Sequence, residues 1–243
     1  SYKNNNSQMS ADDRHLVLSA VPSDAVVVVC GSMADRMCAG ILSSFDIPDS
    51  LAAAVEDGTL TSLKRCPMAV SLHYSGKLVP LYVFDVEDIS EVSEGLLIDK
   101  FKELGCLVEK VDDYLLASVS ESLVKSSARH LGSGVSIVDA PGFADAMESV
   151  DGRDLIFVPH VHVRKLLAAA GGKALTGHSA FVERLADWSA FEVGEDDGSP
   201  MLLKGGFLFE GDPDEFLTVL EDCTPSMSEV GDILPSYTLS FIA

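Results

Sequence analysis

Short β-branched and apolar runs alternate along this chain with segments in which apolar residues recur every three or four positions. Turn residues such as Ser75-Gly76 and Asp112-Asp113 separate neighbouring runs. The runs predict strands over residues 25–30, 68–74, 78–86, 106–111, 114–119, 154–161, 190–193, 201–210 and 237–242. The helical periodicity predicts helices over residues 33–42, 49–56, 94–104, 122–131, 143–149, 163–170, 180–188 and 212–220.

The predicted elements follow the same order twice: strand, one or two helices, hairpin, helix, strand. Counterpart strands in the two halves lie 129, 123 and 123 residues apart. This order favours a duplicated β-α-β-β-α-β unit of the ferredoxin-like kind. We therefore expect an α+β fold of two similar halves, mostly antiparallel sheets with helices packed on one face. The alternative is one irregular α+β domain. The expected divisions are a polar linker over 1–15, a first unit over 16–150 and a second over 151–243, unless the two units form one continuous domain.

The end of the chain resembles its beginning. Residues 20–29 and 233–242 both place an apolar residue and Pro-Ser before a strand-like run. In a ferredoxin-like unit, the strand predicted over 237–242 would pair beside that over 154–161. Alternatively, it opens a further repeat of a longer protein, since fixed-period similarity is the mark of repeats.

Composition and charge restrict the partners. The chain has 243 residues, 47% of them hydrophobic, which is enough for a sizeable core. Its 17 basic and 38 acidic residues give a net charge of −21, which disfavours nucleic-acid binding. No apolar run approaches the roughly 18–20 residues of a membrane span. The polar first ten residues are typical of a linker that follows a removed anchor, so membrane attachment is expected only through a missing N-terminal segment.

The cysteines do not form a recognisable motif. There are five of them and no CxxC pair, which argues against both a zinc ribbon and a disulfide framework. We expect buried free thiols, because unpaired cysteine behaves as a small apolar residue. The five positions are Cys30, Cys38, Cys66, Cys106 and Cys223.

Ser179 is the strongest candidate nucleophile in the sequence. Residues 177–181 begin like the G-x-S-x-G nucleophile elbow, but Phe181 replaces the final glycine that the sharp turn requires. Ser179 also suits the start of a helix, where its hydroxyl would cap the backbone. The helix start is the favoured interpretation, and a hydrolase that uses Ser179 is the alternative.

His160 and His162 are the candidate metal ligands. Two positions apart in a predicted strand, both side chains would project to one face. With an acidic neighbour they could hold a metal ion, but the spacing fixes no third ligand. The glycine pairs also lack the spacing of a phosphate-binding loop. The sequence therefore predicts no catalytic, metal or cofactor-binding residue, and no cofactor. It predicts Trp188 as a core residue, and either a bulge or a close backbone contact at Gly205-Gly206.

Four segments together resemble an uncharacterised family of anchored cell-envelope proteins from Gram-negative gut bacteria. They are residues 16–29, Asp113–Ser120, Ala186-Asp187-Trp188 and Gly205–Phe209. The resemblance implies an extracytoplasmic location, an N-terminal membrane anchor and a longer parent chain, but supplies no catalytic residue. We therefore expect a non-enzymatic extracytoplasmic binding module whose partner is a protein, a glycan or a lipid-like ligand. The alternative is a hydrolase or metal-dependent enzyme that uses His160, His162 or Ser179.

Overall fold

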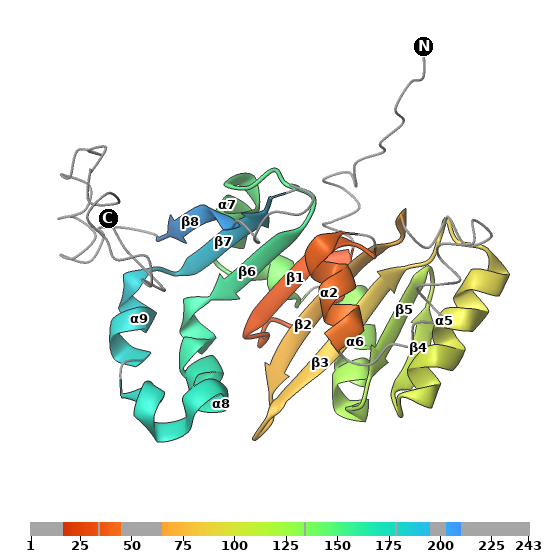
Figure 1. Cartoon of the computed structure of the whole chain (residues 1–243), viewed down its shortest axis with the longest axis horizontal. Coiled ribbons are helices and arrows are strands. Elements are labelled where there is room, and N and C mark those ends of the chain that lie inside the picture. Colours follow the sequence, from red (N-terminus) through yellow and green to blue (C-terminus); the bar gives the residue numbers. More distant parts are fainter. Residues whose placement is uncertain are drawn as a thin grey trace, which may run out of the picture.

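The computed structural model describes residues 17–33, 35–44, 65–133, 135–177, 179–194 and 203–209 (Figure 1). The strands are β1 Val27–Ser32, β2 Pro67–Tyr74, β3 Leu78–Asp85, β4 Leu107–Val111, β5 Tyr114–Ser118, β6 Leu155–Pro159, β7 Trp188–Val193 and β8 Leu203–Leu208. The helices are α2 Arg36–Ser44, α5 Glu91–Glu103, α6 Glu121–Ser133, α7 Phe143–Glu148, α8 Val163–Thr176 and α9 Ser179–Leu185, with short 3-10 turns η1 Ile137–Asp139 and η2 His160–His162. The elements predicted over 49–56, 212–220 and 237–242 lie outside the described residues.

The eight strands form one antiparallel sheet in the order β4-β5-β3-β2-β1-β6-β7-β8. The α+β class and the antiparallel pairing are therefore confirmed. The ferredoxin-like pairing is not found among the described strands. A split βαβ unit places a third strand between the two strands that its helix connects, whereas β1 pairs directly with β2, and β6 directly with β7. Whether the two halves arose by duplication stays a prediction.

The sheet crosses the predicted boundary between residues 150 and 151. β1 and β6 pair at its centre, where Val28 lies opposite Phe157. From this pair outward, each half continues through helices into a hairpin, β2–β3 on one side and β7–β8 on the other (Figure 1). Both edges of β6 are thus occupied by β1 and β7, and residues 237–242, which were expected to pair beside this strand, lie outside the described residues.

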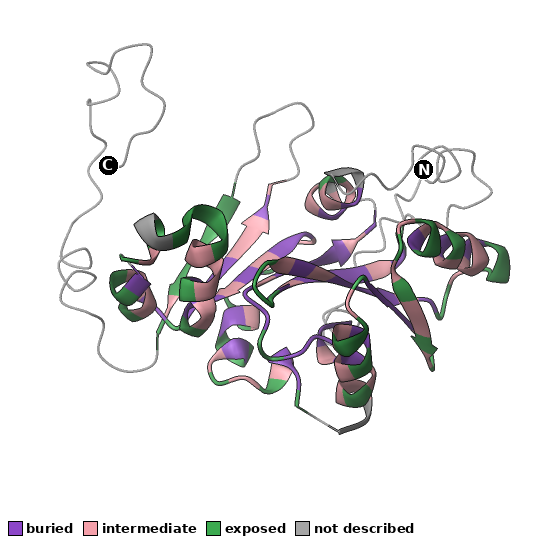
Figure 2. Ribbon diagram, turned by 90° about the horizontal axis from the view of Figure 1, so that it is seen from below, coloured by how far each residue is buried: buried purple, intermediate pink, exposed green. Residues whose placement is uncertain are grey.

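Helices cover both faces of the sheet, so the prediction of a single covered face is wrong (Figure 2). Side chains alternate along each strand, and in β1 both sets are apolar: Val28 and Cys30 face one way, Val29 the other. A sheet with two apolar faces must have other elements packed on both of them. One hydrophobic core packs α2 and α5 against one face of the sheet. A second hydrophobic core packs α6 and α7 against the opposite face.

The turn residues in the sequence correctly predicted the positions of the β2–β3 and β4–β5 hairpins. Gly76 at φ +76° reverses the chain between β2 and β3, and Asp112 at φ +51° does so between β4 and β5. Such left-handed conformations favour Gly, Asn and Asp. The helix predicted over 163–170 is followed by a kink at Gly172, which leaves the helical conformation at φ +59°, and α8 as a whole continues to Thr176. The predicted helix over 180–188 ends earlier: α9 stops at Leu185, and Trp188 already belongs to β7.

Gly205 permits β8 to approach β7 closely, which is one of the two alternatives that the sequence left open for this glycine pair. A Cβ at Gly205 would lie 2.0 Å from the carbonyl oxygen of Ala190, whereas one at Gly206 would meet nothing within 4 Å. We expect Gly205→Ala to lower the free energy of unfolding by about 1–3 kcal/mol through this overlap. The matched variant Gly206→Ala should change it by less than about 1 kcal/mol. Urea denaturation followed by circular dichroism measures both, and equal effects would contradict the close approach.

Candidate functional site

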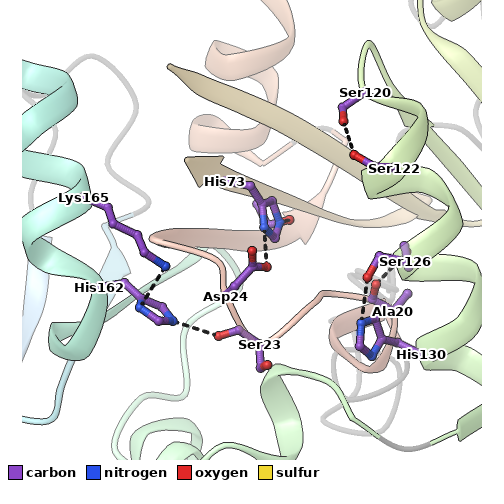
Figure 3. Close-up of polar contacts among 12 residues, drawn as sticks. Ala20, Ser23, Asp24, His73, Ser120, Ser122, Ser126, His130, His162 and Lys165 are labelled. Carbon is purple, nitrogen blue, oxygen red and sulfur yellow. Dashed lines mark hydrogen bonds and ion pairs between the residues drawn. The ribbon is translucent and has the colours of Figure 1, made fainter. Parts of the chain in front are cut away.

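The loop before β1 places Ser23 and Asp24 between elements from both halves of the chain (Figure 3). Antiparallel pairing sets Val27 of β1 opposite Leu72 of β2, which brings this loop beside the end of β2. The hydroxyl of Ser127 on α6 donates to the carbonyl of Ala20 at 2.6 Å and fixes the segment that precedes the loop. Asp24 thus has a fixed position next to His73.

Ser71, His73 and Asp24 form a hydrogen-bonded series. Ser71 and His73 alternate along β2, so both side chains leave the same face of the sheet. Because a carboxylate only accepts, His73 Nδ1–H donates to Asp24 Oδ1 at 2.9 Å. In the neutral ring, His73 Nε2 accepts from the Ser71 hydroxyl at 2.8 Å. The hydrogen bonds thus connect serine, histidine and aspartate in the same sequence as in the catalytic triad of a serine hydrolase.

The exposure of the series is the reverse of what a hydrolase needs. Ser71 is 0% exposed, so a substrate carbonyl cannot reach its hydroxyl. Asp24, the residue that a catalytic triad buries, has a side chain that is 59% exposed. The series therefore presents a carboxylate to the surface and holds it from behind through a buried imidazole.

Helix α6 supplies the other wall of a polar cavity of about 330 Å³ at Asp24. Ser122, Ser126 and Arg129 follow at intervals of four and three residues, which places them on one face of α6. The cavity, called the Asp24 pocket below, is lined by Pro22, Ser23, Asp24, Ser122, Leu123, Ser126, Arg129 and His130.

His130 is the last α6 residue in the pocket lining, and only one of its ring nitrogens has a hydrogen-bond partner among the described residues. Its Nε2 lies 3.0 Å from the Ser126 hydroxyl. Its Nδ1 is buried and has no hydrogen-bond partner among the described residues. Burial, followed by the charge of Arg129, lowers the pKa of His130, which keeps the ring neutral near neutral pH.

On the other side of the loop, His162 and Lys165 approach from η2 and α8. His162 Nε2–H donates to the carbonyl of Ser23 at 3.3 Å, and Lys165 Nζ lies 3.4 Å from His162 Nδ1. Burial and the neighbouring Lys165 charge lower the pKa of His162. The hydrogen bond from His73 lowers the pKa of Asp24 against the opposing effect of burial. The Asp24 carboxylate therefore lies near the charge of Lys165 and lines the same pocket as Arg129, in a chain of net charge −21.

The two histidines singled out in the sequence do not share a face. They lie in η2, a 3-10 turn that follows β6, so the alternation expected of a strand does not apply. Buried His160 donates from Nδ1 to the carbonyl of Val182 at 2.6 Å, and its Nε2 lies 2.7 Å from the Ser189 hydroxyl. His160 therefore joins α9 to β7, while His162 contacts the Asp24 loop.

Ser179 stands at the start of α9, as predicted, and is buried rather than exposed to solvent. The histidines of the described segments all bond elsewhere. His73 contacts Ser71 and Asp24, His130 contacts Ser126, His160 contacts Val182 and Ser189, and His162 contacts Ser23 and Lys165. No serine–histidine pair therefore forms at Ser179 within this part of the chain.

Three of the cysteines are buried free thiols, as expected: Cys30, Cys38 and Cys66. Cys106 is free and half-buried, and Cys223 lies outside the described residues. In the described segments, no group of three or more histidine, cysteine, aspartate or glutamate side chains is arranged to hold a metal ion. Within the same segments, no helix has both the length and the apolar character to cross a membrane.

A second carboxylate, Asp154, is buried at the beginning of α2. It accepts hydrogen bonds from the Met37 backbone N–H and from the Cys38 thiol. Burial, reinforced by the charge of Asp35, raises the pKa of Asp154 to about 6. Asp154 immediately precedes β6, so its hydrogen bonds to Met37 and Cys38 attach the start of α2 to the start of β6. This role is structural.

Sequence analysis missed Ser71, His73 and Asp24 as a group. The local signal was a serine and a histidine two positions apart within the otherwise apolar run of β2. Their partner Asp24 lies 49 residues before His73, and only the pairing of β1 with β2 brings it near.

Comparison of this chain with protein-family models, curated proteins and solved structures found no significant match in any of the three.

Proposed function

We propose that this chain is a non-enzymatic binding module of a larger cell-envelope protein, and that an acidic glycan binds in the Asp24 pocket. The observation that carries the proposal is the polar lining of that pocket, with hydroxyl, guanidinium, imidazole and carboxylate groups around one cavity. The extracytoplasmic location rests on the family resemblance, and the longer parent chain rests on that resemblance and on the similarity of residues 233–242 to residues 20–29.

The chemistry of the pocket favours a glycan over the other two ligand classes. A lipid-like ligand would need apolar walls, whereas Ser122, Ser126 and Asp24 offer donors and acceptors for sugar hydroxyls. Serine hydroxyls both donate and accept, so their bonds within the pocket leave further capacity. A volume of about 330 Å³ lies at the small end of the range for small-molecule sites, which suits one sugar ring better than a protein segment.

Charge favours an acidic sugar over a neutral one. A planar guanidinium such as that of Arg129 can bind a carboxylate through two parallel hydrogen bonds. Lys165 adds a second positive charge beside the loop. The chain as a whole has a net charge of −21, whereas these two cations make the pocket a place where an anionic group can be held.

Binding of glucuronate, measured by isothermal titration calorimetry against glucose as the neutral reference, tests the proposal. We expect glucuronate to bind more tightly than glucose, and Arg129→Met to weaken glucuronate binding by about tenfold or more. The reason is that a charge-assisted hydrogen bond contributes about 1.5–3 kcal/mol, and about 1.4 kcal/mol is tenfold in affinity. Lys125→Met is the matched control, because Lys125 is an exposed cation of the same helix outside the pocket lining.

Three results would contradict the proposal. The first is equal binding of the two sugars or none of either, and the second is an equal loss in both variants. The third is hydrolysis of a p-nitrophenyl ester that Ser71→Ala abolishes, which would mean that the buried serine is an active nucleophile.

A further inference from the structure

β8 is the last strand of the sheet within the described part of the chain, and no described strand pairs with its outer edge (Figure 1). The other edge of β8 pairs with β7. Leu203 and Phe207 of this strand are 46% and 48% exposed. An unpaired edge with exposed apolar side chains is a template for a further strand, and natural proteins usually cover such edges.

The strand order indicates which segment belongs at this edge. The order is the same in both directions from the central pair β1–β6: β2 and β3 follow on one side, and β7 and β8 on the other. The registers agree as well, because one row of paired residues crosses all six strands. On the first side β5 pairs beside β3, so the outer edge of β8 is the counterpart of the β5 position. The row consists of Tyr82, Val70, Val29, Ile156, Phe191 and Gly205.

The segment that reaches residues 237–242 has the length expected for this position. Residues 86–113 connect β3 to β5, and residues 209–236 separate β8 from Tyr237, so each segment has 28 residues. Both segments begin directly after the second strand of a hairpin. A chain that leaves β8 can therefore return to its outer edge over the same number of residues as the chain that leaves β3.

The side chains of the two segments also correspond. Tyr82 and Gly205 hold equivalent places in the row and lie 123 residues apart. The same separation aligns β5, Tyr114–Ser118, with residues 237–241. The first residue is tyrosine and the third is leucine in both segments. In β5 these two residues project to one face and contact the hydrophobic core that packs α6 and α7.

The counterpart of the exposed Phe207 is buried in the first half of the chain. Phe84 of β3 lies 123 residues before Phe207 and is fully buried. Leu115 of β5 lies opposite Phe84, and Phe101 of α5 packs against its ring. A strand beside β8 would remove part of the apolar surface of Phe207 from water in the same way, which favours docking.

We propose that residues 237–242 form an antiparallel strand on the outer edge of β8, in the position that β5 takes beside β3. The separation of 123 residues sets the register through the pairing of β3 with β5: Leu239 lies opposite Gly206, and Thr238 opposite Phe207. Backbone hydrogen bonds hold the strand, as they hold extended segments at other sheet edges. This inference does not depend on the glycan proposal, because it concerns a different surface.

A pair of engineered cysteines tests both the position and the register. Gly206→Cys/Leu239→Cys places two thiols directly opposite each other, at a separation that a disulfide spans. A Cβ at Gly206 would meet nothing within 4 Å, so this site accepts a side chain. Cys106→Ser and Cys223→Ser in every variant remove the native thiols that are not buried among the described residues. We expect oxidation of the full chain to link the new pair within one molecule, as detected by mass spectrometry after cleavage at glutamate.

Gly206→Cys/Ser240→Cys is the matched control, because a shift of one residue turns the second thiol to the opposite face. It should give about a tenth of the linked product or less. Equal yields from the two variants would overturn the proposal. An absence of the link at Leu239 would also overturn it, in favour of a segment that opens a further repeat. A disulfide between two molecules, seen as a dimer on a non-reducing gel, would overturn pairing within one chain and place a second copy at the edge.

Hydrogen exchange of the chain with its native cysteines tests the pairing without a cross-link. Leu239→Pro introduces a residue that does not fit inside a paired strand. It should speed amide exchange over β8 by about tenfold or more, because backbone groups that lose a partner open more often. Exchange over β4, at the opposite end of the sheet, is the internal control and should stay unchanged. Equal exchange over β8 in the wild type and the variant would overturn the proposal.

Discussion

Replacement of Phe101 by alanine is expected to lower the free energy of unfolding by about 3–5 kcal/mol. Phe101 is fully buried on α5 and packs against Tyr82 and Phe84 of β3, with ring centroids 4.9 and 5.4 Å apart. Truncation removes this apolar contact and leaves a cavity that the rigid sheet cannot close. Urea denaturation measures the change.

Val92→Ala on the same helix is the matched control. Val92 is 75% exposed, so its truncation removes almost no buried surface and should change stability by less than about 0.5 kcal/mol. A small effect of Phe101→Ala would mean that α5 does not cover this face of the sheet, and the two-faced architecture would then be wrong.

The second large effect is a pH dependence that arises from Asp154. Its pKa is raised from 3.8 to about 6 in the folded protein. The folded state therefore holds this proton more tightly than the unfolded chain does. The stability contributed by Asp154 is complete below about pH 4 and is lost as the pH rises through about 6. A shift of this size corresponds to about 3 kcal/mol.

Asp154→Asn tests this assignment, because asparagine keeps an acceptor for the Met37 N–H and does not titrate. Stability is measured by urea denaturation from about pH 4 to about pH 6.5. We expect the wild type to lose about 3 kcal/mol relative to Asp154→Asn across this range. Asp99→Asn, at an exposed position on α5, should follow the wild type. An Asp154→Asn profile parallel to that of the wild type would show that Asp154 does not cause the loss.

The sequence predicted elements best where the determining chemistry was local. The β2–β3 and β4–β5 hairpins could be placed because Gly76 and Asp112 adopt the left-handed conformation that their residue types favour. Ser179 was correctly placed at a helix start for a similar reason. Cys30 was correctly expected to be a buried free thiol because the surrounding run is apolar.

The sequence prediction was wrong where the same local pattern of polar and apolar residues is compatible with two different backbone structures or packing arrangements. A polar-apolar-polar run such as His160-Val161-His162 fits a strand end as well as a 3-10 turn, and the structure adopts the turn. The apolar run of β1 also fits a strand with one or with two covered faces. Helices that pack from both sides decide between them, and their arrangement is not encoded in the run itself.

By itself, the sequence determined the α+β class, most strands and helices, the tight turns, the free thiols and the acidic charge. These properties depend on residues within one or two turns of each other. Only the tertiary structure decided that β1 pairs with β6, that both faces of the sheet are buried, and that Asp24 lies against His73. Such contacts join residues far apart in the chain. Many alternative pairings satisfy the same local preferences, and the packing of the whole sheet selects among them.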